Sequence, residues 1–161
     1  MDGENLIERA AELFQQALNA QMRGDLEEAV SLYKLSLAAF PTAEAHTFLG
    51  WTYSFQGMLD DAIAECEKAI AVDPTFGNPY NDIGAYLIEM GRYDDAIPWL
   101  EKATRAPRYE PRHYPHFNLG RVYLAKETYT EALRCFERAL EARPDYRAAR
   151  EVIEAIRRKL N

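Results

Sequence analysis

The sequence has 161 residues, of which 48% are apolar and 28% charged, and its net charge is −7. These values are ordinary for a globular chain, and they exclude a disordered tail, a collagen-like chain and a disulfide-rich scaffold. The length predicts one domain over residues 1–161. The acidity argues against a nucleic-acid partner or an anionic membrane, because both attract basic proteins.

Related positions recur along the chain at intervals of about 34 residues. Gly50, Gly84 and Gly120 lie 34 and 36 residues apart, and alanines recur in the same rhythm at positions 29, 62, 96 and 132. A period of this length, seen four times, predicts a stack of similar helical units. Glycine or alanine at these positions lets the two helices of a unit approach closely.

Each unit has the pattern of two amphipathic helices joined by a turn. The expected turns lie at residues 23–25, 56–58, 89–92 and 126–128. Three of them contain glycine at the end of a helix, where the backbone often needs a positive φ. We expect the Asn78 amide to cap the helix that begins at Pro79, and Pro98 to lie in or just after the first turn of a later helix.

Two segments of the chain resemble the tetratricopeptide repeat. They read LGWTY…G…DDAI…EKAI…DP over residues 49–74 and LGRVY…TEAL…FERAL…RP over residues 119–144. The resemblance implies an all-α fold, a right-handed α-solenoid of four helix-turn-helix repeats with a C-terminal capping helix. The implied repeats span about 10–42, 43–76, 77–112 and 113–146, and the capping helix spans about 145–160.

In this family the first helices of the repeats line a concave groove that binds peptides. The resemblance therefore implies a peptide-binding groove formed by Thr47, Trp51, Asn81, Phe117, Asn118 and Arg121. For Trp51 and Phe117 two roles stay open, an aromatic anchor for a ligand or packing against a neighbouring helix. Asn81 and Asn118 carry amides that suit a peptide backbone.

One family subset grips a C-terminal carboxylate with lysine, arginine and asparagine. Neither alignment of the repeats with that pattern supplies the cations. Asp82 at one of the matching positions would repel a carboxylate. We therefore do not expect a chaperone-clamp protein.

The segment between the third and fourth repeats is two residues longer than its counterpart. It combines Arg105, Arg108 and Arg112 with Tyr109 and several prolines. Such a segment forms either a secondary contact loop for an acidic partner or an insertion tolerated at the surface.

No catalytic motif is present in the sequence, which lacks a phosphate-binding loop, a nucleophile elbow and the HExxH zinc motif. His113 and His116 lie one helical turn apart near Glu110, but Pro115 separates them and packing roles are favoured. We expect no enzyme activity, no cofactor and no metal site.

The cysteine pattern bears on location. Cys66 and Cys135 are far apart, without a CxxC motif, which predicts reduced thiols in a cytoplasmic protein. No run approaches 18 apolar residues, and the acidic start lacks the pattern of a signal peptide. We therefore expect neither membrane insertion nor a leader.

These features predict a non-catalytic interaction module that binds an extended or helical peptide of another protein. The alternative is an assembly scaffold of copies stacked head to tail, which would appear as weak self-association. It draws on the charge distribution, since residues 1–80 carry a net −9 and residues 81–161 a net +2. A regulatory fragment of a larger enzyme is the third reading, and no residue supports it.

Overall fold

The computed structural model describes residues 3–161, and within them the chain forms nine α-helices and no β-strand. This confirms the all-α prediction. The helices are α1 (Gly3–Met22), α2 (Leu26–Ala39), α3 (Ala43–Phe55), α4 (Leu59–Val72), α5 (Asn78–Glu89), α6 (Tyr93–Arg105), α7 (His113–Ala125), α8 (Tyr129–Ala142) and α9 (Arg147–Leu160).

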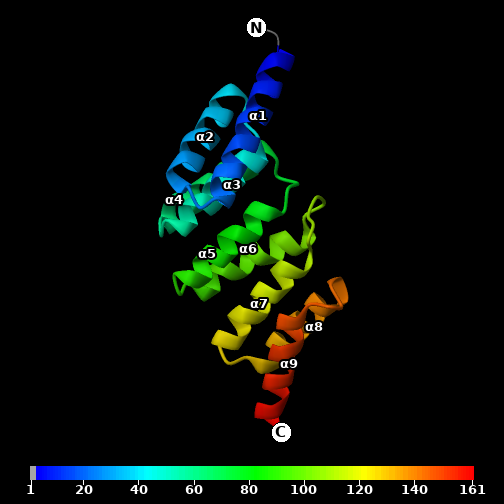
Figure 1. Ribbon diagram of the computed structural model, residues 1–161. Coiled ribbons are helices and arrows are strands. Elements are labelled where there is room, and N and C mark those ends of the chain that lie inside the picture. Colours follow the sequence, from blue (N-terminus) through cyan, green and yellow to red (C-terminus); the bar gives the residue numbers. More distant parts are fainter. Residues whose placement is uncertain (1–2) are drawn as a thin grey trace.

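The helices form successive antiparallel pairs that stack into an elongated body, with the two ends of the chain at opposite ends of the stack (Figure 1). The closest contacts lie within the pairs α1–α2, α3–α4, α5–α6 and α7–α8. In addition α5 touches both α3 and α7, so the first helices of consecutive pairs lie side by side. Their common surface is called the first-helix face below.

The turns within the pairs use the left-handed backbone region, as the sequence predicts for three of them. Gly24, Gly57 and Gly91 have φ values of 81°, 76° and 75°. The fourth turn has Glu127 in the same role, at φ 58°. A side chain in this region costs up to about 1 kcal/mol relative to glycine, so this turn carries local strain that the others avoid.

Glycine lets the helices of three pairs approach closely, which confirms the close packing expected at Gly50, Gly84 and Gly120. A Cβ atom on Gly84 would overlap the side chain of Leu100. A Cβ on Gly120 would lie 2.5 Å from Cε1 of Phe136, and one on Gly50 would lie 2.9 Å from a backbone oxygen of α4. Large side chains of the second helix therefore fill the space beside Gly84 and Gly120, whereas the backbone of α4 itself approaches Gly50.

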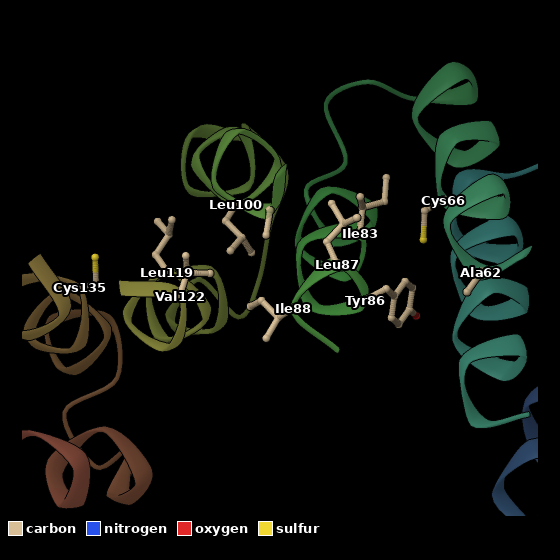
Figure 2. Packing of buried hydrophobic residues seen from close by; sticks show 11 residues of the cluster. Ala62, Cys66, Ile83, Tyr86, Leu87, Ile88, Leu100, Leu119, Val122 and Cys135 are labelled. Carbon is tan, nitrogen blue, oxygen red and sulfur yellow. The ribbon is translucent and has the colours of Figure 1, made fainter. Parts of the chain in front are cut away.

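The largest buried cluster runs through α4 to α8 and joins neighbouring pairs into one core (Figure 2). Cys66 lies in it on α4 and Cys135 on α8, and both are buried free thiols. Burial raises the pKa of each thiol, which keeps both protonated and unreactive. No helix within residues 3–161 has the length and apolar character needed to cross a membrane.

The last helix covers the end of the stack, as a capping helix does. Ile153 and Ile156 of α9 are buried against Phe136 and its neighbours. The opposite side of α9 is exposed and rich in charge, including Arg157, which pairs with Glu137 of α8 at 3.0 Å. The helix therefore closes the apolar core and presents a polar surface to water.

Candidate functional site

A cleft of about 410 Å³ opens on the first-helix face, in the middle of the stack. Three consecutive first helices and the two loops between repeats contribute to it. Half of the side chains that line it are aromatic. They are Thr47, Phe48 and Trp51 of α3, Phe76, Asn78, Asn81 and Asp82 of the next loop and α5, and Tyr109, Pro111 and Tyr114 of the following loop and α7.

One wall of the cleft is an aromatic stripe along α3. Phe48, Trp51 and Phe55 are spaced three and four residues apart, so they share one side of the helix. Ring centroids lie 5.9 Å apart between Phe48 and Trp51 and 4.9 Å apart between Trp51 and Phe55, which is 57% exposed. The Trp51 ring therefore packs on its neighbours and also lines the cleft, and its role as an anchor for a ligand stays a prediction.

Two asparagines connect α5 to α7 beside the cleft. The Nδ2 atom of Asn118 donates to Oδ1 of Asn81 over 2.9 Å, and both side chains are buried. Arg121 donates to Oδ1 of Asn118 over 3.0 Å, while the rest of its side chain is exposed. Within the described residues Nδ2 of Asn81 makes no hydrogen bond, so it remains a donor for a peptide carbonyl group.

Asp82 lines the cleft one helical turn beyond Asn78. Among residues 3–161 its carboxylate makes no hydrogen bond and no ion pair, and burial alone raises its pKa to about 7. From the sequence, Asp82 is expected only to repel a carboxylate. The sequence does indicate that Asp82 has no ion-pair partner on its own helix, because none of the residues three or four positions away on α5 is basic.

The loop between α6 and α7 folds back onto the loop before α5 and deepens the cleft. The Gly77 amide donates to the Arg108 carbonyl oxygen over 2.9 Å, and the Arg108 amide donates to the Thr75 carbonyl oxygen over 3.0 Å. The Tyr109 ring is buried against Gly77, where a Cβ atom would have no room. The extra residues therefore form one wall of the cleft.

The same pairing overturns the expected helix cap. Gly77 has helical backbone angles, α5 begins at Asn78, and no side chain caps it. The amide of Gly77 is held by the Arg108 carbonyl, which extends the helical conformation one residue upstream of the expected position. The Asn78 side chain lines the cleft instead.

The arginines predicted for a secondary contact loop differ in their surroundings. Arg108 pairs with Glu44 at 3.0 Å and with Asp73 at 2.7 Å. Arg112 donates to two backbone carbonyl groups of its own loop at 2.9 and 3.2 Å. Arg105 is exposed at the end of α6 and makes no ion pair within the described residues. Two of the three guanidinium groups therefore hold the loop in place.

Phe117 lies away from the cleft. The centroid of its ring lies 5.2 Å from those of both Phe136 and Tyr146, so Phe117 is part of the packing at the C-terminal end of the stack. Thr47 lines the cleft, but its hydroxyl donates to the Ala43 carbonyl oxygen of its own helix over 2.7 Å. The structure thus brings Thr47, Trp51 and Asn81 together and places Asn118 and Arg121 next along the face.

The histidines are part of the packing between elements. His113 is buried between Tyr114 and Tyr146, with ring centroids at 4.1 and 4.5 Å, and burial lowers its pKa. Nδ1 of His46 lies 2.7 Å from Oε2 of Glu65, which links α3 to α4. Across residues 3–161 no three histidine, cysteine or acidic side chains gather as metal ligands would.

The sequence of this chain also matches a known protein family. Two models of the tetratricopeptide repeat match the chain, one over residues 43–76 and the other over residues 77–145, together more than half of it. The chain belongs to the tetratricopeptide-repeat (TPR) family. TPR proteins generally mediate contacts between proteins and scaffold assemblies, which supports the coarse function expected from the sequence.

The TPR chain is also similar to individual proteins. It is 30% identical over 127 residues to the type IV pilus assembly protein PilF of Pseudomonas aeruginosa, a match that covers 78% of this chain and 50% of PilF. The solved structure of P. aeruginosa PilF superposes with a TM-score of 0.90 at 26% identity, over 96% of this chain and 70% of that one. The structure of MamA gives 0.74 at 25% identity, over 87% of this chain and 81% of that one. The chain spans half or less of the curated relatives it matches.

Proposed function

We propose that the TPR chain is a non-catalytic interaction module that binds a peptide of another protein, extended or helical, in the cleft of the first-helix face. The observation that carries this proposal is the convergence of aromatic rings and polar groups from three consecutive helices in one cleft of about 410 Å³. Binding sites of this kind combine apolar walls with a few well-placed polar groups.

The residues around the cleft suit distinct parts of a peptide. The Trp51 ring provides a large apolar anchor, and truncation of such anchors typically costs about 2 kcal/mol or more of binding energy. Nδ2 of Asn81 offers a hydrogen bond to a backbone carbonyl. Arg121 lies farther along the face, where an acidic group of the peptide would meet it. The bond between Asn81 and Asn118 holds these groups in place before binding, which reduces the entropy that binding costs.

The test compares the two tryptophans of the chain. Trp51 lines the cleft, whereas Trp99 is half-buried on α6 outside it. Immobilised wild-type protein, Trp51→Ala, Arg121→Glu and Trp99→Ala are incubated with native lysate, and the retained proteins are quantified by mass spectrometry. We expect the partner to be retained by wild type and Trp99→Ala and lost with Trp51→Ala, while Arg121→Glu tests whether the contact extends along the face beyond the cleft.

The partner identified in this way is then titrated as a purified protein against all four forms, with melting curves to show that each is folded. If Trp51→Ala and Trp99→Ala bind it with equal affinity, the cleft is not the binding surface and the proposal is refuted.

The likeness to PilF adds a setting for this function. We propose a role in the assembly of a multi-protein structure, with the cleft holding one component of it. The match covers only half of PilF, and the proposal rests on that half alone. The cytoplasmic location expected from the two cysteines stays a prediction, which cell fractionation checks.

Head-to-tail self-association is the second candidate function. The unequal charges of the two halves, −9 and +2, favour it, and exposed Arg105 lies in the more basic half. Light scattering at rising protein concentration tests it. Growth of the particles that salt reverses supports a scaffold held by screened charges. A constant monomer mass across the concentration range refutes it.

A further inference from the structure

We propose that the cleft selects a peptide with a cationic side chain, lysine or arginine, which pairs with the Asp82 carboxylate between the aromatic walls. This inference rests on the proposed function and names the chemistry of the ligand. The same negative charge by which Asp82 would repel a carboxylate attracts a lysine or arginine side chain.

The first observation is the isolation of the Asp82 carboxylate. It lines the cleft and has no hydrogen-bond or ion-pair partner among the described residues. A carboxylate that is partly withdrawn from water without a counter-ion destabilises the folded protein. Burial accordingly raises its pKa to about 7. A ligand cation supplies the missing partner, so part of this unfavourable energy is relieved on binding.

The second observation is that the chain's own nearby cations are engaged elsewhere. Arg108 lies at the rim of the cleft, but Glu44 and Asp73 hold its guanidinium group. Arg121 lies outside the cleft, where its guanidinium group donates to Oδ1 of Asn118. Neither of them neutralises Asp82, which leaves that position open to a cation from outside.

The third observation is the nature of the walls. Five aromatic side chains line the cleft together with Asp82, and the faces of aromatic rings attract cations. The chain already shows this contact at the rim, where the Arg108 guanidinium lies 4.3 Å from the centre of the Phe76 ring. The stems of lysine and arginine are apolar, so they suit the same walls as the charge does.

The net charge of the chain points the same way. It is −7 over the 161 residues. Long-range attraction therefore favours the approach of a basic peptide over that of an acidic one. An acidic or C-terminal carboxylate ligand is therefore the less favoured occupant.

The experiment selects phage-displayed random dodecapeptides on the wild-type protein at about pH 8, where the Asp82 carboxylate is ionised. We expect lysine or arginine to be enriched at one fixed position. The consensus peptide is then synthesised, together with an analogue in which citrulline or norleucine replaces the base. On wild type the analogue binds at least about tenfold more weakly, as expected for loss of a partly buried charge pair.

Two variants complete the comparison. Asp82→Asn removes the carboxylate from the cleft, and Asp60→Asn removes the same charge from an exposed site on α4. We expect Asp82→Asn to lower the affinity for the consensus peptide at least about tenfold. The variant should bind the neutral analogue with the same affinity as wild type, which also shows that it is folded. Asp60→Asn changes neither affinity by more than about twofold.

The other outcomes refute the inference in distinguishable ways. A neutral or acidic consensus whose binding needs Trp51 leaves the proposed function in place and overturns the preference for a cation. Equal losses with Asp82→Asn and Asp60→Asn attribute the preference to general acidity of the surface and also overturn it. If no selected peptide depends on Trp51, both the inference and the proposed function fail.

Discussion

Replacement of Asp82 by asparagine is expected to stabilise the folded protein at neutral pH, although it removes a polar contact site for a ligand. Burial raises the pKa of Asp82 from 3.8 to about 7, a change of roughly three units. At 1.36 kcal/mol per unit a sealed carboxyl group would cost about 4 kcal/mol when ionised. The Asp82 side chain is partly exposed in the open cleft, so we expect about half of this, ~2 kcal/mol.

The sign follows from the protons bound in each state. Below about pH 3 the carboxyl group is largely protonated in both the folded and the unfolded chain, and it has little pH-dependent effect. Between its unfolded pKa of 3.8 and its folded pKa of about 7, the folded protein binds the additional proton. Stability therefore falls as the pH rises through this window, and the full penalty is present above it.

Urea denaturation at a series of pH values measures the effect. Wild type, Asp82→Asn and Glu67→Gln are compared, because Glu67 is exposed in the middle of α4 and its replacement reports the general loss of one negative charge. We expect the advantage of Asp82→Asn over wild type to grow by ~2 kcal/mol between about pH 4 and pH 8. A pH-independent difference, or a variant less stable than wild type at pH 8, would show that the carboxylate has a stabilising partner and refute the reasoning.

Three further predictions concern the turns, the packing and the loop. Glu127→Gly should raise the free energy of unfolding by about 0.5–1 kcal/mol, because it removes a side chain from φ 58°; a loss on urea denaturation contradicts this. Gly120→Ala should lower the free energy of unfolding by about 1–3 kcal/mol, since the new Cβ would lie 2.5 Å from Phe136, and an unchanged urea midpoint disproves the close contact. Arg108→Gln should speed amide hydrogen exchange of residues 106–112, because the pairing with Glu44 and Asp73 is lost; unchanged exchange means that backbone pairing alone holds the loop.

Part of the candidate site could be predicted from the sequence by register. Once the repeats are aligned, positions on the first helix repeat with the period of the family, so Trp51 and Asn81 are placed on the groove side before any coordinates are known. Phe117 follows the same rule, yet its ring packs against Phe136 and Tyr146 at the end of the stack. Register identifies the side of a helix, whereas the neighbouring helices decide whether that side is open.

The composition of the loop between α6 and α7 does not predict where its side chains lie. Composition predicts an accessible basic and aromatic segment at Arg105, Arg108, Tyr109 and Arg112. In the structure the Tyr109 ring is buried against Gly77 and forms a wall of the cleft. The sequence reveals that the segment is longer than its counterpart, but not that its backbone pairs with a loop about 30 residues earlier.

The sequence by itself determined the local features of this protein, because they depend on residues close in the chain. The helix pairs follow from apolar spacing, the turns from Gly24, Gly57 and Gly91, and the family from the repeated motifs. Only the tertiary structure decided the environment of Asp82 and the pairing of Arg108 with Asp73, which lies 35 residues away. Desolvation and ion pairing depend on distance in space, and side chains from three repeats meet at the cleft only after the stack has formed.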